Sequence, residues 1–147
     1  PIRRVSREDA QRIAPFPVEI PRAVPTGFAL ADVTVFQPDP STPLTRVFVT
    51  YRRPDASQPL VLTYQAAGVP SELPAATSDT QELRIDGHRA LYVDLAAEGA
   101  RPADGDGPPM QLGRLILERL DVVLSASGDR RDGLGADALA AILSSIP

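Results

Sequence analysis

The 147-residue chain contains no cysteine, lysine, asparagine or tryptophan. Without cysteine it cannot form disulfides, thiolate nucleophiles or thiolate metal sites. Without lysine it cannot form a Schiff base or supply the lysine of a phosphate-binding P-loop. All 15 of its Lys and Arg residues are therefore arginine. Together with the abundant alanine and the 16 prolines, we interpret this bias as that of a high-GC bacterial genome.

Charge and length limit the class of protein further. The formal net charge is −4 and the arginines are scattered, so the basic surface of a nucleic-acid-binding protein is missing and we expect no nucleic-acid partner. The chain suffices for one hydrophobic core, so we expect a single domain over residues 1–147. No apolar run approaches the roughly 20 residues that cross a bilayer. Since the chain starts at Pro1 rather than at methionine, we expect contact with a membrane only through an anchor upstream of it.

Prolines dictate the conformation of residues 14–28. They stand at Pro15, Pro17, Pro21 and Pro25. Each one fixes φ, removes a backbone donor and disfavours helix in the residue before it, so this segment is predicted to be an extended strap. Its apolar side chains are expected to be buried, namely Phe16, Val18, Ile20, Val24 and Phe28. Just before the strap, Ser6 with Asp9 three residues later predicts a capped helix over residues 7–14.

Alternating and β-branched runs predict the strands. The runs cover residues 28–36, 45–52, 60–65, 81–85, 88–95, 112–117 and 122–127. The pair Asp86-Gly87 is the one that a two-residue type I′ turn prefers, so the runs on either side of it are predicted to form a hairpin.

The C-terminal residues complete the fold. Apolar residues at i, i+3, i+4 and i+7 predict an amphipathic helix over residues 136–146. We predict an α+β fold with a single antiparallel, meander-like twisted sheet of about six to seven strands, and with the N-terminal and C-terminal helices packed on one face. The strands at residues 112–117 and 122–127 are apolar on both faces and are expected at its centre. Residues 68–79 are predicted to be a loop and residues 98–109 a flexible insertion.

His88 is the only histidine, so any Ser-His or multi-histidine metal site would have to include it. In its strand, Leu91 and Val93 form the apolar face, and His88 is expected on the polar face with Tyr92 and Asp94. No serine stands in a nucleophile elbow. We therefore interpret His88 as an exposed hairpin residue and predict no catalytic residue.

The acidic residues offer no complete ligand set. Residues 104–107 begin like a calcium loop, but prolines and Leu115 occupy later positions that need oxygen ligands and glycine. We predict no metal and no cofactor. Paired carboxylates stay open, because Glu118 and Asp121, or Asp79 and Glu82, could meet in space, although acids near hairpin ends usually serve solubility.

The arginines of one predicted strand are the candidate binding groups. Arg52 and Arg53, with Arg46 on the same strand, could receive an acidic partner or lipid headgroups. The alternative is that they form the solvated face of an edge strand that charge keeps soluble. With Tyr92 and His88, these arginines make up the partner or ligand surface that the sequence predicts.

The order of several motifs resembles a bacterial domain family of unknown function. The motifs are Ala14-Pro15-Phe16-Pro17, Ile20-Pro21, Val24-Pro25-Thr26-Gly27-Phe28, Val49-Thr50-Tyr51, Ile85-Asp86-Gly87-His88 and the helix over residues 139–146. The family is found in extracytoplasmic parts of anti-sigma factors and of lipoproteins, and the resemblance covers nearly the whole chain. The chain departs from it in the insertion over residues 98–109 and in having aliphatic residues around Ile116, where the family usually shows a tryptophan.

This resemblance implies a non-catalytic sensor or interaction domain in the cell envelope, tethered to the membrane by an upstream segment. It carries over no catalytic residue, and its partner would be a protein that the sequence does not identify. The alternative is a carrier, because a curved antiparallel sheet with helices over one side resembles bacterial lipoprotein-carrier folds. Such a carrier would hold a small apolar ligand such as a lipid between sheet and helix.

Overall fold

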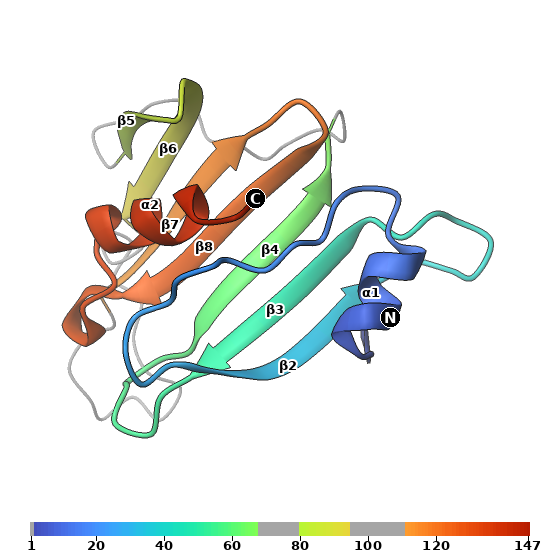
Figure 1. Ribbon diagram of the computed structural model, residues 1–147, viewed down its shortest axis with the longest axis horizontal. Helices are drawn as coiled ribbons and strands as arrows, with labels where there is room; N and C mark the ends of the chain where they lie inside the picture. Colours follow the sequence, from blue (N-terminus) through green and yellow to red (C-terminus); the bar gives the residue numbers. More distant parts are fainter. Residues whose placement is uncertain (1, 68–79, 95–110) are drawn as a thin grey trace.

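The computed structural model describes residues 2–67, 80–94 and 111–147. In this part of the chain, one antiparallel sheet of eight strands and two α-helices form an α+β fold, which confirms the predicted class (Figure 1). The predicted count of six to seven strands is wrong, because a short strand at Ile2–Arg4 adds to one edge of the sheet. The predicted loop at residues 68–79 and the predicted insertion at residues 98–109 lie outside the described residues.

The elements follow the predicted order with small shifts at their ends. The strands are β1 (Ile2–Arg4), β2 (Ala29–Phe36), β3 (Arg46–Arg52), β4 (Leu60–Ala66), β5 (Thr80–Ile85), β6 (His88–Asp94), β7 (Leu112–Glu118) and β8 (Val122–Asp129). The helices are α1 (Arg7–Ile13), the 3₁₀ turn η2 (Arg130–Asp132) and α2 (Ala136–Ser144). None of these helices is long and apolar enough to cross a membrane.

The strand order is β1-β2-β3-β4-β8-β7-β6-β5, and every neighbouring pair is antiparallel. The sheet is therefore two four-stranded meanders joined through their last strands, so the predicted meander-like order holds within each half and is broken between β4 and β5. The expected central position is confirmed for β8, which pairs with β4 in the middle of the sheet, while β7 is an inner strand third from the β5 edge. The predicted turn between β5 and β6 is also confirmed, since Asp86 and Gly87 have φ values of 51° and 82°, as a type I′ turn requires.

Both α-helices and the strap lie on one face of the sheet (Figure 1). Helix α1 packs on β2, and α2 packs on β7 and β8. The strap crosses the sheet between them, so residues 14–28 cover the middle strands that the helices leave open (Figure 1). No described helix lies on the opposite side, which we call the uncovered face.

The strap is extended, as its prolines predict, and it buries Phe16, Val18 and Phe28. Ile20 and Val24 are half-buried. Because a strap has no ladder partner, its backbone must find other hydrogen bonds.

Several contacts supply hydrogen bonds to the strap, among them one each from α1, β4 and the segment after α2. Gln11 of α1 donates its Nε2 to the carbonyl of Val18 at 2.8 Å. The Tyr64 hydroxyl on β4 donates to the carbonyl of Glu19 at 2.7 Å. The backbone N–H of Arg22 donates to the carbonyl of Ser145, just after α2, at 3.1 Å. Burial raises the pKa of Tyr64, so this hydroxyl keeps the proton that it donates.

The ends of the helices follow from local chemistry. Ser6 caps α1, since its hydroxyl oxygen accepts from the N–H of Asp9 at 3.0 Å, and the helix ends before Pro15. At the other end of the chain, Arg119 on the β7–β8 turn donates to the carbonyl of Ile146 at 2.9 Å and to that of Leu143 at 3.4 Å. A guanidinium at this position satisfies carbonyls that the end of α2 leaves without intrahelical partners.

We expect Tyr64→Phe to lower the free energy of unfolding by about 1 kcal/mol, because it removes the hydrogen bond to the strap and leaves the carbonyl of Glu19 without this donor. Tyr51→Phe is the matched control, since Tyr51 is also buried and its hydroxyl makes no hydrogen bond to a described residue. Urea denaturation of both variants measures the difference. Equal losses in the two would contradict a specific role of this bond.

Candidate functional site

The pairing register shows which residues share the uncovered face. One row across the strands is Thr34, Phe48, Thr63, Ser125 and Ile116. The next row is Asp32, Thr50, Val61, Ser127 and Arg114. Residues that alternate with these along each strand point to the other face and form the core under the helices.

The accessible part of the uncovered face is centred on β3 and β4. There Thr34, Thr50 and Thr63 are half-buried, as is Ser127 of β8, and we call these four side chains the hydroxyl floor. Further across the sheet the face is closed, since Ile116 is 9% exposed and Leu91 of β6 is 1% exposed. The site is therefore a surface of short hydroxyl side chains, with Phe48 and Val61 among them, held on inner strands.

Arginines surround the hydroxyl floor. Arg46 and Arg52 stand at the two ends of β3. Arg114, on β7, lies opposite Ser127 of β8. Arg52 and Arg114 are exposed and Arg46 is half-buried. The edge-strand interpretation of Arg46 and Arg52 is wrong, because β3 is paired on both sides, with β2 and with β4.

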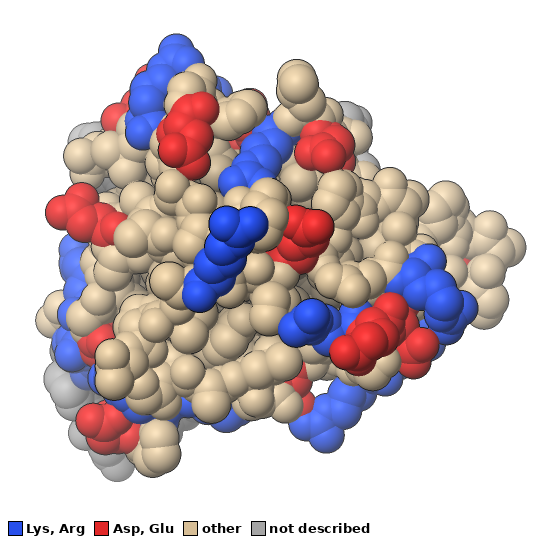
Figure 2. Space-filling view, viewed as in Figure 1, with Lys and Arg blue, Asp and Glu red and all other residues tan. Residues whose placement is uncertain are grey.

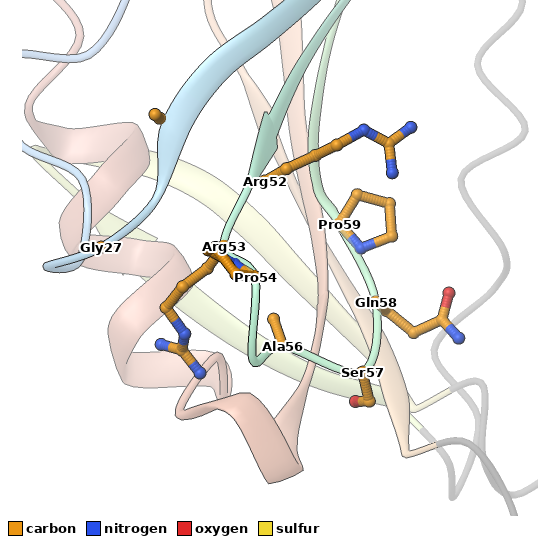
Figure 3. Close-up of a pocket in the computed structure, with 9 residues that line it drawn as sticks. Gly27, Arg52, Arg53, Pro54, Ala56, Ser57, Gln58 and Pro59 are labelled. Carbon is orange, nitrogen blue, oxygen red and sulfur yellow. The ribbon is translucent and has the colours of Figure 1, made fainter.

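Arg52 and Arg53 are adjacent but serve different sides of the sheet (Figure 3). Arg53 turns toward the helix side, where its guanidinium lies 4.7 Å from the centroid of the Phe28 ring. Its Nε is 2.6 Å from a carboxylate oxygen of Asp55, and its Nη1 donates to the carbonyl of Asp132 at 3.4 Å. Arg53 is thus occupied within the fold, whereas Arg52 makes no ion pair or hydrogen bond to any described residue.

A hollow of about 500 Å³ lies at this end of β3 (Figure 3). Its lining is Gly27, Ala29, Arg52, Arg53, Pro54, Ala56, Ser57, Gln58 and Pro59. The rim is fixed by Asp132 of η2, whose carboxylate accepts from the N–H and the hydroxyl of Ser57, both at 2.9 Å, and from the N–H of Gln58 at 3.2 Å. The Ser57 hydroxyl and the N–H groups of Ser57 and Gln58 are therefore already paired, whereas Arg52 and the side-chain amide of Gln58 make no hydrogen bond to a described residue.

Asp129 holds η2 in place and was not identified from the sequence. It is fully buried, and its carboxylate accepts from the N–H of Arg131 at 2.8 Å, from Nη2 of Arg131 at 2.8 Å and from the N–H of Gln111 at 3.2 Å. Burial raises the pKa of this carboxyl, but the hydrogen bonds from Arg131 and Gln111 outweigh it and hold the pKa below its usual value. The spacing of Asp129 and Gly133 is the sequence signal that could have identified this turn. Asp129 is its N-cap, and Gly133, four residues later, is its C-cap in the left-handed conformation.

Tyr92 belongs to the core and not to a binding surface. The predicted alternation along β6 is correct, but its two faces are interchanged. Tyr92 is 7% exposed and pairs with Leu115 under the helices, while Leu91 and Val93 point to the uncovered face. Its ring lies directly over Gly113, and burial raises the pKa of its hydroxyl. The physical reason is that α2 covers β7 and β8, so Tyr92, on the face of β6 that continues this layer, joins the core beneath the helix.

His88 lies at the start of β6, opposite Ile85, and is half-buried. Its ring makes no hydrogen bond to a described residue. Nearby in sequence, the carboxylate of Asp86 accepts directly from the hydroxyl of Ser144 at 3.0 Å, with no imidazole between them. Among the residues that the structure describes, no three His, Cys, Asp or Glu side chains gather as a metal site.

The five predicted surface residues are not brought together. Three strands, β4, β8 and β7, separate β3 from β6, which is about 19 Å at roughly 4.8 Å per strand step. Arg46 and Arg52 also lie on the face opposite to Tyr92 and His88. The structure instead combines these two arginines with Arg114 and the hydroxyl floor. The alternation of Ser125 and Ser127 with Leu124 and Ala126 was the signal that could have identified this polar face.

Comparison with known proteins adds no relative. No protein-family model, no curated protein and no solved structure matches this chain.

We expect Asp129→Asn to destabilise the protein by about 1–3 kcal/mol at pH 7, because a neutral amide cannot replace the charged acceptor of Arg131. The folded-state pKa is lowered, so the stabilisation is present above the unfolded-state pKa of roughly 4 and is lost as the pH falls through the folded value. The difference in the free energy of unfolding between wild type and variant, measured by urea titration, should therefore shrink as the pH is lowered from 5 to 2.

Asp121→Asn is the control for this change, since Asp121 is exposed on the β7–β8 turn. It should show neither the loss at pH 7 nor the pH dependence. A stability gap for Asp129→Asn that stays constant on acidification would contradict the charged state assigned to Asp129.

We expect Gly113→Ala to destabilise the fold by about 1–3 kcal/mol, because the new Cβ would stand 2.5 Å from Cζ of Tyr92 and nearer still to its hydroxyl. Gly135→Ala is the matched control, since a Cβ there meets nothing within 4 Å. Thermal unfolding compares the two variants. Adding Tyr92→Leu should restore part of the loss in Gly113→Ala, and failure of this rescue would show that the clash is not the cause.

Proposed function

We propose that this chain is a non-catalytic sensor or interaction domain that works outside the cytoplasm as part of a membrane-tethered bacterial protein, of the anti-sigma-factor or lipoprotein type. The observation that carries the proposal is the difference between the two sides of the sheet. One side is sealed by helices and strap, and the other holds hydroxyl and arginine side chains on paired inner strands. A rigid polar surface of this kind is suited to binding a partner.

The filled layer under the helices favours this function over that of a lipid carrier. The side chains between α2 and the sheet are fully buried and in mutual contact, including Leu115, Leu117, Leu124, Leu139 and Leu143. A carrier would need an apolar cavity there, because a bound acyl chain must occupy volume between sheet and helix. Protein interiors packed in this way yield such volume only at a large cost in stability.

The chemistry of the surface favours binding over catalysis. The carboxylate opposite Thr50, that of Asp32, forms an ion pair with Arg4, and His88 lies on the other face of the sheet, on β6. The arginines around the hydroxyl floor offer fixed N–H donors and positive charge, which recognise a partner without reacting with it.

The proposal is tested by photocrosslinking in cells of the organism that encodes the protein. A photoreactive amino acid replaces Thr50 or Ser127 on the uncovered face of the full-length protein, and Glu8 or Ala141 on the exposed helix side serves as the control position. We expect the protein in the cell-envelope fraction and a discrete protein adduct from Thr50 and Ser127 only.

Two outcomes would contradict the proposal. Recovery of the protein in the cytoplasmic fraction would contradict its location. Adducts of equal yield from all four positions, or from none, would contradict a partner surface on the uncovered face.

A further inference from the structure

The described charged side chains of the uncovered face are mostly basic. Among the residues that the structure describes, the strands place nine charged side chains on this face. They are six arginines, Arg4, Arg46, Arg52, Arg84, Arg89 and Arg114, and three carboxylates, Asp32, Glu82 and Glu118. The described side chains of this face therefore sum to +3, whereas the 14 arginines and 14 acidic residues of the whole described part of the chain cancel. The helix side, in contrast, shows both signs interspersed (Figure 2).

Half of these arginines are already used within the fold. Arg4 forms an ion pair with Asp32, and Arg89 lies 3.0 Å from a carboxylate oxygen of Glu82. Arg84 donates to the carbonyl of Gly87 at 3.2 Å. The other three arginines, Arg46, Arg52 and Arg114, make no ion pair or hydrogen bond to any described residue.

These three unpaired arginines surround the hydroxyl floor. Arg46 and Arg52 are six residues apart on one strand, which is about 20 Å at roughly 3.3 Å per residue. Arg114 stands three strands from β3, or about 14 Å at the usual strand spacing. The three charges thus mark the boundary of a surface whose interior offers short hydroxyl donors and acceptors.

Their positions argue against a role in solubility alone. Proteins place charge on edge strands to prevent edge-to-edge pairing, but the edges of this sheet are β1 and β5. The unpaired arginines stand on the inner strands β3 and β7. Charge on the face of an inner strand does not protect an edge, so it is available for recognition.

We propose that the uncovered face binds an acidic, extended segment of a partner protein, with carboxylates of that segment paired to Arg46, Arg52 and Arg114. The inference rests on the proposed function and names the chemistry of the partner. Arginine pairs with carboxylates through two parallel N–H groups, which fixes direction as well as charge. The hydroxyl floor supplies hydrogen bonds to the backbone of the segment as it passes between the arginines.

The hydroxyl floor favours a protein segment over a membrane surface. Anionic headgroups are attracted by clusters of projecting basic residues and require no fixed hydrogen-bonding groups between them. Here the three arginines are far apart, and the half-buried side chains between them are the hydroxyl floor together with Phe48 and Val61. A peptide with regularly spaced acceptors and donors can use both features at once.

The test measures binding of a fluorescein-labelled peptide in which glutamate alternates with serine, at low ionic strength. We expect Arg46→Gln/Arg52→Gln/Arg114→Gln to weaken binding about tenfold or more. The matched control Arg3→Gln/Arg12→Gln/Arg22→Gln removes the same charge from exposed positions outside the uncovered face and should change binding less than about twofold.

A second measurement locates the peptide on the molecule. In an NMR titration of the wild-type protein, the largest amide shifts should fall on Thr50, Thr63 and Ser127, and the amides of α1 and α2 should stay unchanged. This arm remains informative if the triple variant is poorly folded.

Several outcomes would overturn the inference. The wild type would fail to bind the peptide, or both triple variants would weaken peptide binding equally, or the largest NMR shifts would fall on the helices. Preferential binding to vesicles containing phosphatidylglycerol, lost in the Arg46, Arg52 and Arg114 variant, would identify a membrane as the occupant. Dimerisation lost in the same variant would identify a second copy of the chain. The two proposals can also be separated. If position 50 still crosslinks a partner in cells, and the Arg46, Arg52 and Arg114 variant binds that partner as well as the wild type does, the proposed function stands and this inference fails.

Discussion

The pairing of β4 with β8 is the contact on which the rest of the structure depends. It runs from Val61 opposite Ser127 to Ala66 opposite Val122 and joins two four-stranded meanders into one sheet. Without it each meander would expose an open edge of unpaired backbone groups. The same register creates both faces of the molecule. It sets Leu62 beside Ala126 in the core and Thr63 beside Ser125 on the opposite side.

The strap and helices make the two sides of this sheet unequal. Prolines prevent the strap from forming either a helix or a further strand, so it lies over the sheet and buries its aromatic side chains. Its carbonyls are satisfied by side chains from α1 and β4, for example by Tyr64. All these elements are on one face, which leaves the other face to present polar groups.

Tertiary structure separates arginines with internal roles from arginines that remain available. Arg119 satisfies carbonyls at the end of α2, Arg131 neutralises the buried Asp129, and Arg53 bridges Phe28 and the η2 turn. These side chains hold the ends of the sheet and cannot bind a partner without loss of stability. Arg46, Arg52 and Arg114 have no such role among the described residues, which is why the proposed surface is built on them.

Local rules in the sequence were enough for the strap, the type I′ turn, the capped first helix, the amphipathic last helix and seven of the eight strands. Each depends on groups close in sequence, such as a proline ring or an Asp-Gly pair.

Strand β1 was missed, because three residues carry no readable period and form a strand only against the edge of β2. The strand order and the burial of Tyr92 were also decided by tertiary structure. Which face of an alternating strand is buried depends on where distant helices dock, and pairing between β4 and β8 joins residues more than fifty positions apart. Sequence therefore determined the elements and their periodicity, while the site arose only when non-local pairing placed arginines and hydroxyls of five strands on one side.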